Sequence, residues 1–260
     1  MLPLNRVIGS LAGTLLVSVS LGQSFNVDFS TGIHSEGFGV PSAAFGGAAN
    51  QPGFWTEFST DVDGPVAAMG LDGQASGVSM FLVAPTTVLS LNDPGTSGDV
   101  EALLDDSIFG FGDVVGTITL SGLANGDYRV IVYGFAGGQP QEQTLFMIGS
   151  ESGVSGGAWN GSFRAGVTHV DLIVEVTDGT MTIEAVGGVW GQSGYLNGFQ
   201  LTHLDGCSID FTGDGLLDNG DIAAFVAAFL AGDLSADLSG DGILDTGDIT
   251  SFVQAFLAGC

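Results

Sequence analysis

The chain has 260 residues and is strongly acidic, with 29 Asp and Glu residues against 3 Lys and Arg and a formal net charge of −26. This balance repels nucleic acid and anionic membrane surfaces, so neither is an expected partner. The absence of any lysine excludes lysine Schiff-base chemistry and a P-loop.

Residues 1–22 have the pattern of a secretory signal peptide. Arg6 supplies a positively charged start, and residues 7–21 are mostly apolar but too short to span a membrane. Small residues precede Gln23, where cleavage is expected. Since no later segment is long and apolar enough to cross a membrane, the sequence predicts a secreted or cell-surface protein with no transmembrane segment after the signal is removed.

Residues 23–204 are predicted to form one antiparallel β-sandwich of the jelly-roll kind, because short alternating segments are separated by glycine-rich turns. The first strand is expected to pair with the last, and a short helical stretch is expected only at 99–106. The expected strands cover residues 25–29, 54–58, 78–83, 115–120, 128–135, 143–148, 167–176, 180–186 and 195–204.

Two stretches, GTITLSGLANGDYRVIVYG (116–134) and GYLNGFQLTHL (194–204), resemble galactose-binding-like jelly rolls, a group that includes many carbohydrate-binding modules. The resemblance implies a fold, with polysaccharide as the expected ligand. Sugar binding would use exposed aromatic faces and nearby amides, although the same aromatic residues can instead fill the core. The candidate ligand-binding residues are Trp55, Trp159, Asn160, Trp190, Tyr195 and Asn197.

No catalytic set is recognisable in the sandwich, so a non-catalytic protein is expected. His34, His169 and His203 are isolated, without the His-x-x-x-His spacing of a zinc site. A polysaccharide-degrading hydrolase remains an alternative, because glycoside hydrolysis needs only two carboxylates across a cleft. A purely structural cell-surface protein is a second alternative. The carboxylates considered for hydrolysis are Glu57, Asp105, Asp106, Glu175 and Glu184.

Two acidic segments, DFTGDGLLDNGD (210–221) and DLSGDGILDTGD (237–248), have the ligand spacing of EF-hand-like calcium loops. Such a loop uses oxygen ligands, a backbone carbonyl at position 7 and a glycine at position 6. Donors without His or Cys favour calcium, so two ions are predicted. The first set is Asp210, Thr212, Asp214, Leu216, Asp218 and Asp221; the second is Asp237, Ser239, Asp241, Ile243, Asp245 and Asp248.

Each acidic loop runs into the same helical pattern. The apolar residues of each helix recur at i, i+3, i+4, i+7 and i+8, and the two helices are expected to bury these stripes against each other with pseudo-twofold symmetry. The stripes are Ile222, Phe225, Val226, Phe229 and Leu230, and Ile249, Phe252, Val253, Phe256 and Leu257.

The doubled loop-helix unit, with Asp at position 12 of both loops, resembles a type I dockerin over residues 207–260. The resemblance implies that residues 205–260 form a small calcium-folded anchor that docks onto a cohesin-like or other cell-surface scaffold protein. The chain ends in Gly-Cys, as do some dockerin-like anchoring modules.

Cys207 and Cys260 flank this segment and are most simply paired in one disulfide, as exported proteins allow. The alternative is that Cys260 is processed or attached to the cell surface. The sequence therefore predicts a secreted, non-catalytic, calcium-dependent binding protein in which a β-sandwich is displayed by a dockerin-like module.

Overall fold

The computed structural model describes residues 23–30, 39–59, 64–83, 87–91, 93–111, 114–187, 193–204, 209–212 and 217–258. Several predictions fall outside these ranges: the signal peptide, the calcium ligands Asp214 and Leu216, the candidate Trp190, and the cysteines Cys207 and Cys260. Over the described ranges, no helix has both the length and the apolar character needed to cross a membrane.

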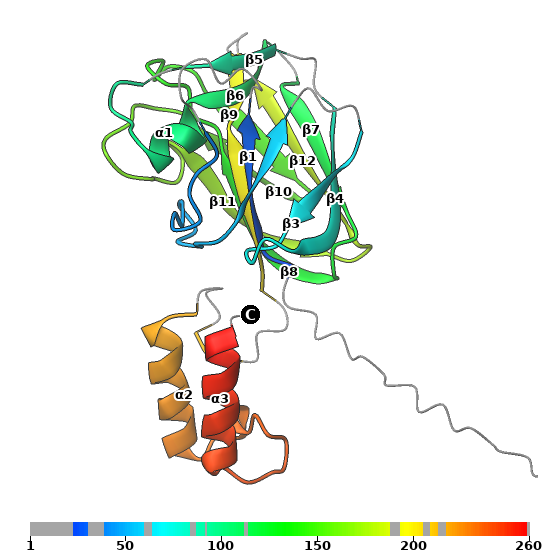
Figure 1. Ribbon diagram of the computed structural model, residues 1–260, viewed down its shortest axis with the longest axis vertical. Coiled ribbons are helices and arrows are strands. Elements are labelled where there is room, and N and C mark those ends of the chain that lie inside the picture. Colours follow the sequence, from blue (N-terminus) through cyan, green and yellow to red (C-terminus); the bar gives the residue numbers. More distant parts are fainter. Residues whose placement is uncertain are drawn as a thin grey trace, which may run out of the picture.

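The strands of the described chain form three sheets, and helices follow them near the C-terminus (Figure 1). The five-stranded sheet contains, in order, β11 (His169–Val176), β8 (Gly126–Tyr133), β14 (Gly198–His203), β1 (Phe25–Ser30) and β2 (Trp55–Ser59). The six-stranded sheet contains β10 (Glu151–Ser155), β9 (Thr144–Ile148), β12 (Thr180–Gly187), β7 (Gly116–Ser121), β4 (Ala75–Val83) and β3 (Val66–Met69). The three-stranded sheet contains β13 (Ser193–Leu196), β6 (Asp106–Phe111) and β5 (Thr87–Ser90).

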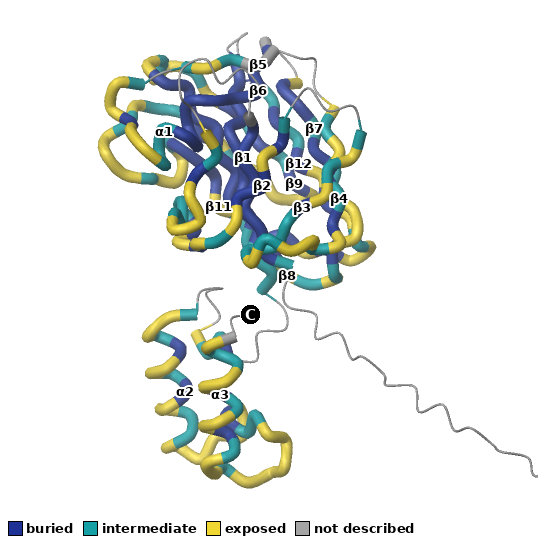
Figure 2. Tube along the Cα trace, in the orientation of Figure 1, coloured by how far each residue is buried: buried dark blue, intermediate teal, exposed yellow. Residues whose placement is uncertain are grey.

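The two larger sheets form a sandwich around one apolar core, which appears as the buried strands of Figure 2. Alternate residues of each strand face this core, for example Ile118 and Leu120 of β7 and Ile183 and Ala185 of β12. The predicted pairing of the first and last strands is confirmed, since β1 and β14 run antiparallel with Phe25 opposite Leu201.

The expectation of a purely antiparallel sandwich is wrong at one edge. β2 pairs with β1 in parallel, with Asn26 opposite Trp55 and Asp28 opposite Glu57. Parallel neighbours need a crossover of about a dozen residues or more, and the connection over 31–54 is long enough. The predicted strand 195–204 is also divided at Asn197, so that β13 and β14 belong to different sheets.

The outer face of the five-stranded sheet is buried over part of its area. The short helix α1 (Asp99–Leu104), which the sequence predicts, places Leu103 and Leu104 in a second apolar cluster with Ile131 and Tyr133 of β8. The loop at 43–51 covers the same face. Some residues of this sheet that point away from the main core are therefore still buried.

The C-terminal helices are α2 (Asn219–Ala231) and α3 (Thr246–Ala258), with a single 3-10 turn, η1 (Leu234–Ala236), between them. The two helices lie side by side (Figure 1). Phe225 and Phe252, which occupy equivalent positions in the repeat, stack with ring centroids 4.1 Å apart and an interplanar angle of 8°. The duplicated sequence thus produces a core around two equivalent rings.

Candidate functional site

The second acidic loop, 237–248, is described throughout and is shaped by its own carboxylates. The amides of Gly240 and Gly242 donate to the two oxygens of Asp237 at 2.9 and 2.8 Å, and the Ile243 amide donates to Asp241 at 2.9 Å. Gly240 and Gly242 have φ angles of 72° and 81°, a region that favours glycine. The Asp-Gly pattern thus produces a tight loop with carboxylates on its inside.

The aspartate at position 12 closes each loop. Asp248 is 0% exposed and accepts from the Ser239 amide at 3.0 Å and the Asp245 amide at 2.9 Å. Asp221 accepts equivalent bonds from the Thr212 amide at 3.0 Å and the Asp218 amide at 2.9 Å. Because α2 and α3 begin within these loops, the same carboxylates also cap the helix starts.

These hydrogen bonds keep both buried carboxylates ionised. Burial would raise the pKa of Asp221, but the amides of Asp218 and Thr212 outweigh it and hold the pKa below the ordinary aspartate value. The Asp245 and Ser239 amides likewise lower the pKa of Asp248. Each loop therefore holds a fixed negative charge at the position where a calcium loop needs one.

The donor set fits calcium, whereas the loop side chains that the structure describes are not grouped around a single point. All donors of both loops are carboxylate, hydroxyl or carbonyl oxygens, which suits a hard cation. Within the ranges that the structure describes, however, no group of three or more His, Cys, Asp or Glu side chains is placed to hold a metal. Asp237, Asp241 and Asp245 instead accept hydrogen bonds from loop amides. Calcium binding therefore stays a prediction.

The two helices expose part of their apolar stripes, which corrects the expectation that the whole stripes bury against each other. Only the phenylalanines of each stripe pack between the helices. The residues at i, i+4 and i+8 turn progressively away from this narrow contact because successive helical residues advance by about 100°. The exposed fractions are 38%, 45% and 79% for Ile222, Val226 and Leu230, and 42%, 47% and 81% for Ile249, Val253 and Leu257.

In the sandwich, three of the predicted sugar-binding residues are structural. Trp55, Tyr195 and Asn197 are 3%, 2% and 0% exposed, so almost none of their surface is open to a polysaccharide. The Trp55 indole donates to the Phe45 carbonyl at 3.1 Å under the covering loop, and Tyr195 packs against Phe109 with ring centroids 5.2 Å apart. These corrections share one cause: the sequence does not show which faces of the sheets are covered by other segments.

Two other candidates lie together in loops. Trp159 is half-buried, donates its indole N–H to the Gly95 carbonyl at 3.0 Å and packs edge-on against Phe135 and Phe163. Asn160 is exposed and accepts from the amide and hydroxyl of Ser162. Trp159 thus joins the loop over 93–98 to the loop over 157–163, and part of its surface remains open to solvent.

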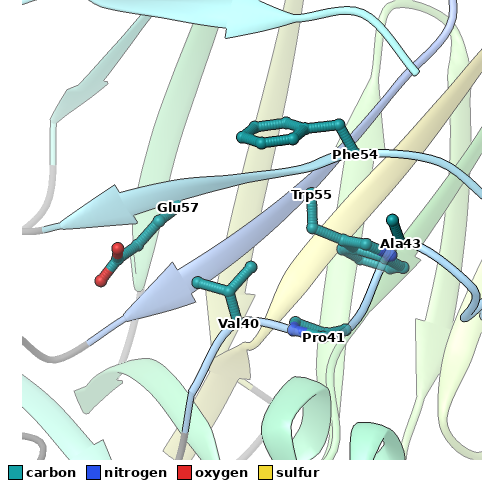
Figure 3. Close-up of a pocket in the computed structure, with 6 residues that line it drawn as sticks. All are labelled: Val40, Pro41, Ala43, Phe54, Trp55 and Glu57. Atoms are coloured by element: carbon teal, nitrogen blue, oxygen red, sulfur yellow. The ribbon is translucent and has the colours of Figure 1, made fainter. Parts of the chain in front are cut away.

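A hollow of about 360 Å³ lies beside the edge strand β2 (Figure 3). Its lining includes Phe54, which is 42% exposed, and the exposed carboxylate Glu57, with apolar residues around them. An apolar wall with one carboxylate suits a ligand that has both an apolar face and hydroxyl groups. Sequence reasoning named Glu57 only as a possible hydrolytic acid and missed Phe54, because the exposure of this residue, just before β2, is not readable from the local sequence. The lining is Val40, Pro41, Ala43, Phe54, Trp55 and Glu57.

Three of the carboxylates considered for hydrolysis, Glu175, Glu184 and Asp105, do not lie together in an open cleft. Glu175 and Glu184 belong to strands of different sheets. Asp105 is 0% exposed, and its burial raises its pKa to about 7 in spite of a hydrogen bond from Thr96. A buried acid with this pKa has the right protonation for general acid catalysis, but no substrate atom can reach it.

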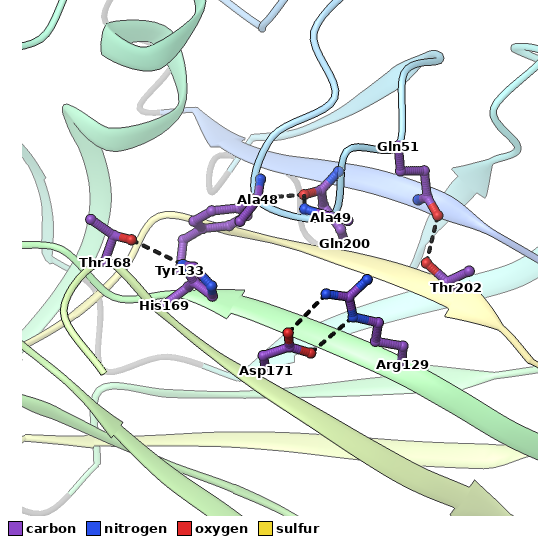
Figure 4. Close-up of polar contacts among 10 residues, drawn as sticks. All are labelled: Ala48, Ala49, Gln51, Arg129, Tyr133, Thr168, His169, Asp171, Gln200 and Thr202. Atoms are coloured by element: carbon purple, nitrogen blue, oxygen red, sulfur yellow. Dashed lines mark hydrogen bonds and ion pairs between the residues drawn. The ribbon is translucent and has the colours of Figure 1, made fainter. Parts of the chain in front are cut away.

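A buried polar network fastens the covering loop to the outer face of the five-stranded sheet (Figure 4). The side-chain oxygen Oε1 of Gln200 accepts hydrogen bonds from the Tyr133 hydroxyl and from the Ala49 amide, the latter at 3.1 Å. The Thr202 hydroxyl donates to the Gln51 side chain at 2.6 Å. Arg129 and Asp171 form a two-bonded ion pair next to this network. Sequence reasoning missed these residues because only the strand pairing brings them together.

His169, at the margin of this network, should make the sandwich sensitive to acid. It is 5% exposed, and burial lowers its pKa from 6.5 to about 4. Between pH 6.5 and about pH 4, the unfolded chain therefore binds a proton at His169 that the folded chain does not bind. The contribution of the neutral His169 to the free energy of unfolding is complete above pH 6.5 and is lost as the pH falls toward 4. We expect a loss of about 2 kcal/mol at pH 5. Urea unfolding of the native chain and His169→Gln checks this, because the variant should lose less stability over the same interval; parallel pH profiles would contradict it.

No protein-family model matches the chain, and no curated protein matches it. The β-region is similar in structure to carbohydrate-binding modules. It aligns with a family 61 module solved with β-1,4-galactotriose (TM-score 0.27, 15% identity, 48% of this chain and 88% of that one). It also aligns with a CBM36 domain of a xylanase from the hindgut metagenome of Trinervitermes trinervoides (TM-score 0.29, 14% identity, 47% and 95%).

A third likeness is to the protein YXIM from Bacillus subtilis, with a TM-score of 0.41 and 14% identity over 70% of this chain. The chain spans 40% of the length of that protein. At such identities and TM-scores the three likenesses are too distant to assign a function.

Proposed function

We propose that the C-terminal helices form a calcium-dependent, dockerin-like attachment module that displays the β-sandwich outside the cell. The observation that carries this proposal is the matched pair of apolar rows, Ile222-Val226-Leu230 and Ile249-Val253-Leu257, with nearly equal exposure on the two helices. Single exposed apolar residues are ordinary, whereas repeated rows in a small acidic module indicate a contact surface.

Calcium would be held by the twelve loop residues identified in the sequence, six in each loop. Bound there, the ion supplies the positive charge that offsets four aspartates in each loop. Asp221 and Asp248 connect this charge to the helices, since each closes its loop and lies in the first turn of the following helix. The spacing between the apolar rows thus depends on both loops being folded.

The partner that this surface suits is a scaffold protein of the cell surface, cohesin-like in kind. No Lys or Arg occurs after Arg164, so the rows are surrounded by acidic and neutral residues. A complementary surface would be apolar at its centre and basic at its rim. Attachment of this type does not require any catalytic activity of the sandwich.

For the sandwich, the hollow beside β2 supports non-catalytic polysaccharide binding. Phe54 offers an exposed aromatic ring, and Glu57 offers a carboxylate that accepts from sugar hydroxyls. The half-buried Trp159 and the exposed Asn160 form a second aromatic-amide pair in the loops. Affinity gel electrophoresis on a series of plant and algal polysaccharides, with Phe54→Ala against the native chain, tests this part.

The attachment proposal is tested by placing charge within the apolar rows. The double variant Val226→Asp, Val253→Asp should lose calcium-dependent retention on the envelope fraction of the producing cell by more than tenfold, because each substitution puts a charge in the contact. The matched control is Ala227→Asp, Gln254→Asp, which adds the same charges at equivalent exposed positions beside the rows.

Both double variants should keep the helical circular dichroism of the native chain in calcium, since all four positions are exposed. Retention that persists in chelator, or that both variants lose equally, would contradict attachment through these rows. Loss confined to Val226→Asp, Val253→Asp supports it.

A further inference from the structure

The carboxyl group of Asp28 is buried without a hydrogen-bond partner for one of its oxygens. Asp28 lies on β1 and is 1% exposed, and its Oδ1 has no partner within the described residues. An unpaired buried carboxylate is costly, by several kcal/mol or more, unless it is neutralised or bound to a cation. The position therefore calls for an explanation that the attachment module and the hollow do not supply.

The strand register places Asp28 among other acids. Phe25, Val27 and Phe29 face the main core, so Asp28 points to the opposite face of β1. Glu57 lies directly opposite Asp28 on the parallel strand β2, and its exposed side chain is on the same face. The other neighbour, on β14, is Gly198, which contributes no side chain.

Asp106, the first residue of β6, completes the group. It is 4% exposed, and its charge raises the pKa of Asp28 more than that of Glu57 does, after burial, which is the largest influence. The three acids come from strands of two different sheets, β1 and β2 in the five-stranded sheet and β6 in the three-stranded one. Their carboxyl groups therefore belong to strands that meet at a seam between the sheets.

Such an arrangement suits a hard divalent cation. It offers only oxygen donors, which calcium prefers. The three carboxylates do not meet at one point as the described residues lie. Glu57 is long and exposed, and the strand register places it on the same face as Asp28.

We propose that a calcium ion binds at Asp28 in the β-sandwich, with Glu57 and Asp106 as further ligands, so that the ion joins β1, β2 and β6. Glu57 also lines the hollow of Figure 3, which places this ion next to the hollow. The proposal does not depend on calcium in the C-terminal loops.

The test uses the full chain with both C-terminal loops disabled by Asp210→Asn, Asp221→Asn, Asp237→Asn and Asp248→Asn. Calorimetric titration with calcium chloride should show about one ion per chain in this background. At a hundredfold excess over Kd the unfolding midpoint of the sandwich should rise on the order of 5–10 °C. Adding Asp28→Asn should remove both the ion and the shift.

The matched control is Glu175→Gln, which removes an exposed acid from β11 of the same sheet and should leave both responses unchanged. In chelator, Asp28→Asn should be at least as stable as its parent, because it removes an unpaired buried carboxylate. Its effect thus reverses sign between chelator and calcium, which a purely structural role would not produce.

A loop-disabled chain that binds no calcium, or an Asp28→Asn variant that keeps the ion, would overturn the proposal. If Asp28→Asn does not fold, Glu57→Gln decides, since this exposed substitution should weaken calcium binding at least tenfold, and unchanged affinity would count against the site. Because the C-terminal loops are disabled throughout, failure of the attachment proposal does not affect the result.

Discussion

Removal of calcium is expected to unfold the C-terminal helices while the β-sandwich stays folded. The described core of the helical part has only four fully buried apolar residues: Ile209, Phe225, Ala236 and Phe252. A unit of about fifty residues with so small a core is marginal without a metal or a crosslink. Each loop also carries four aspartates within twelve residues, and without a cation their repulsion favours the open chain.

Far-UV circular dichroism during chelation and calcium titration measures this effect, with the number of bound ions read from mass spectrometry under native conditions. We expect two ions to bind and the helical signal to return with them. Magnesium at the same ionic strength is the control, because it screens charge equally but demands a smaller, octahedral site. A helical signal that survives complete chelation, or that magnesium restores equally well, would contradict a calcium-folded module.

Asn197→Ala is expected to destabilise the sandwich by about 3–6 kcal/mol, since it leaves three buried polar groups without partners. The Asn197 amide donates to the Leu104 and Asp106 carbonyls at 2.7 and 2.9 Å, and its oxygen accepts from the Phe135 amide at 2.7 Å. These bonds hold the break between β13 and β14 against the segment that leads from α1 into β6.

Urea unfolding followed by tryptophan fluorescence measures the loss. Asn160→Ala is the matched control, because Asn160 is exposed and bonded only within its own loop, and its removal should change stability by less than about 0.5 kcal/mol. An Asn197→Ala variant that is as stable as the native chain but binds polysaccharide less well would return Asn197 to the role of a ligand-binding residue.

Patterns that depend only on neighbouring residues were readable in the sequence. The repeat around Phe225 and Phe252 predicted both helices, because residues three and four apart share a helix face. The alternation at 180–186 predicted β12, because successive side chains of a strand face opposite sides. The two acidic segments were interpreted as calcium loops for the same reason, since their carboxylates and glycines stand at fixed positions within twelve residues, and calcium binding by them stays a prediction.

Features that depend on distant segments were not readable. Trp55 and Tyr195 look like ligand-binding aromatics when only their glycine-bearing surroundings are considered, yet other segments cover both. The exposed rows of α2 and α3 follow from how narrow the helix contact is, which periodicity does not determine. The network of Gln200, Tyr133 and Gln51 exists only because β14, β8 and the covering loop meet.

The sequence by itself determined the β-rich body, the two terminal helices and the donor chemistry of the acidic loops, because each depends on local spacing. Only the tertiary structure decided which aromatic residues are buried, which helix faces are open and that Asp28 lies beside Glu57. The physical reason is that burial and charge proximity depend on which strands become neighbours, and a parallel crossover such as β1 to β2 joins residues that are far apart in the chain.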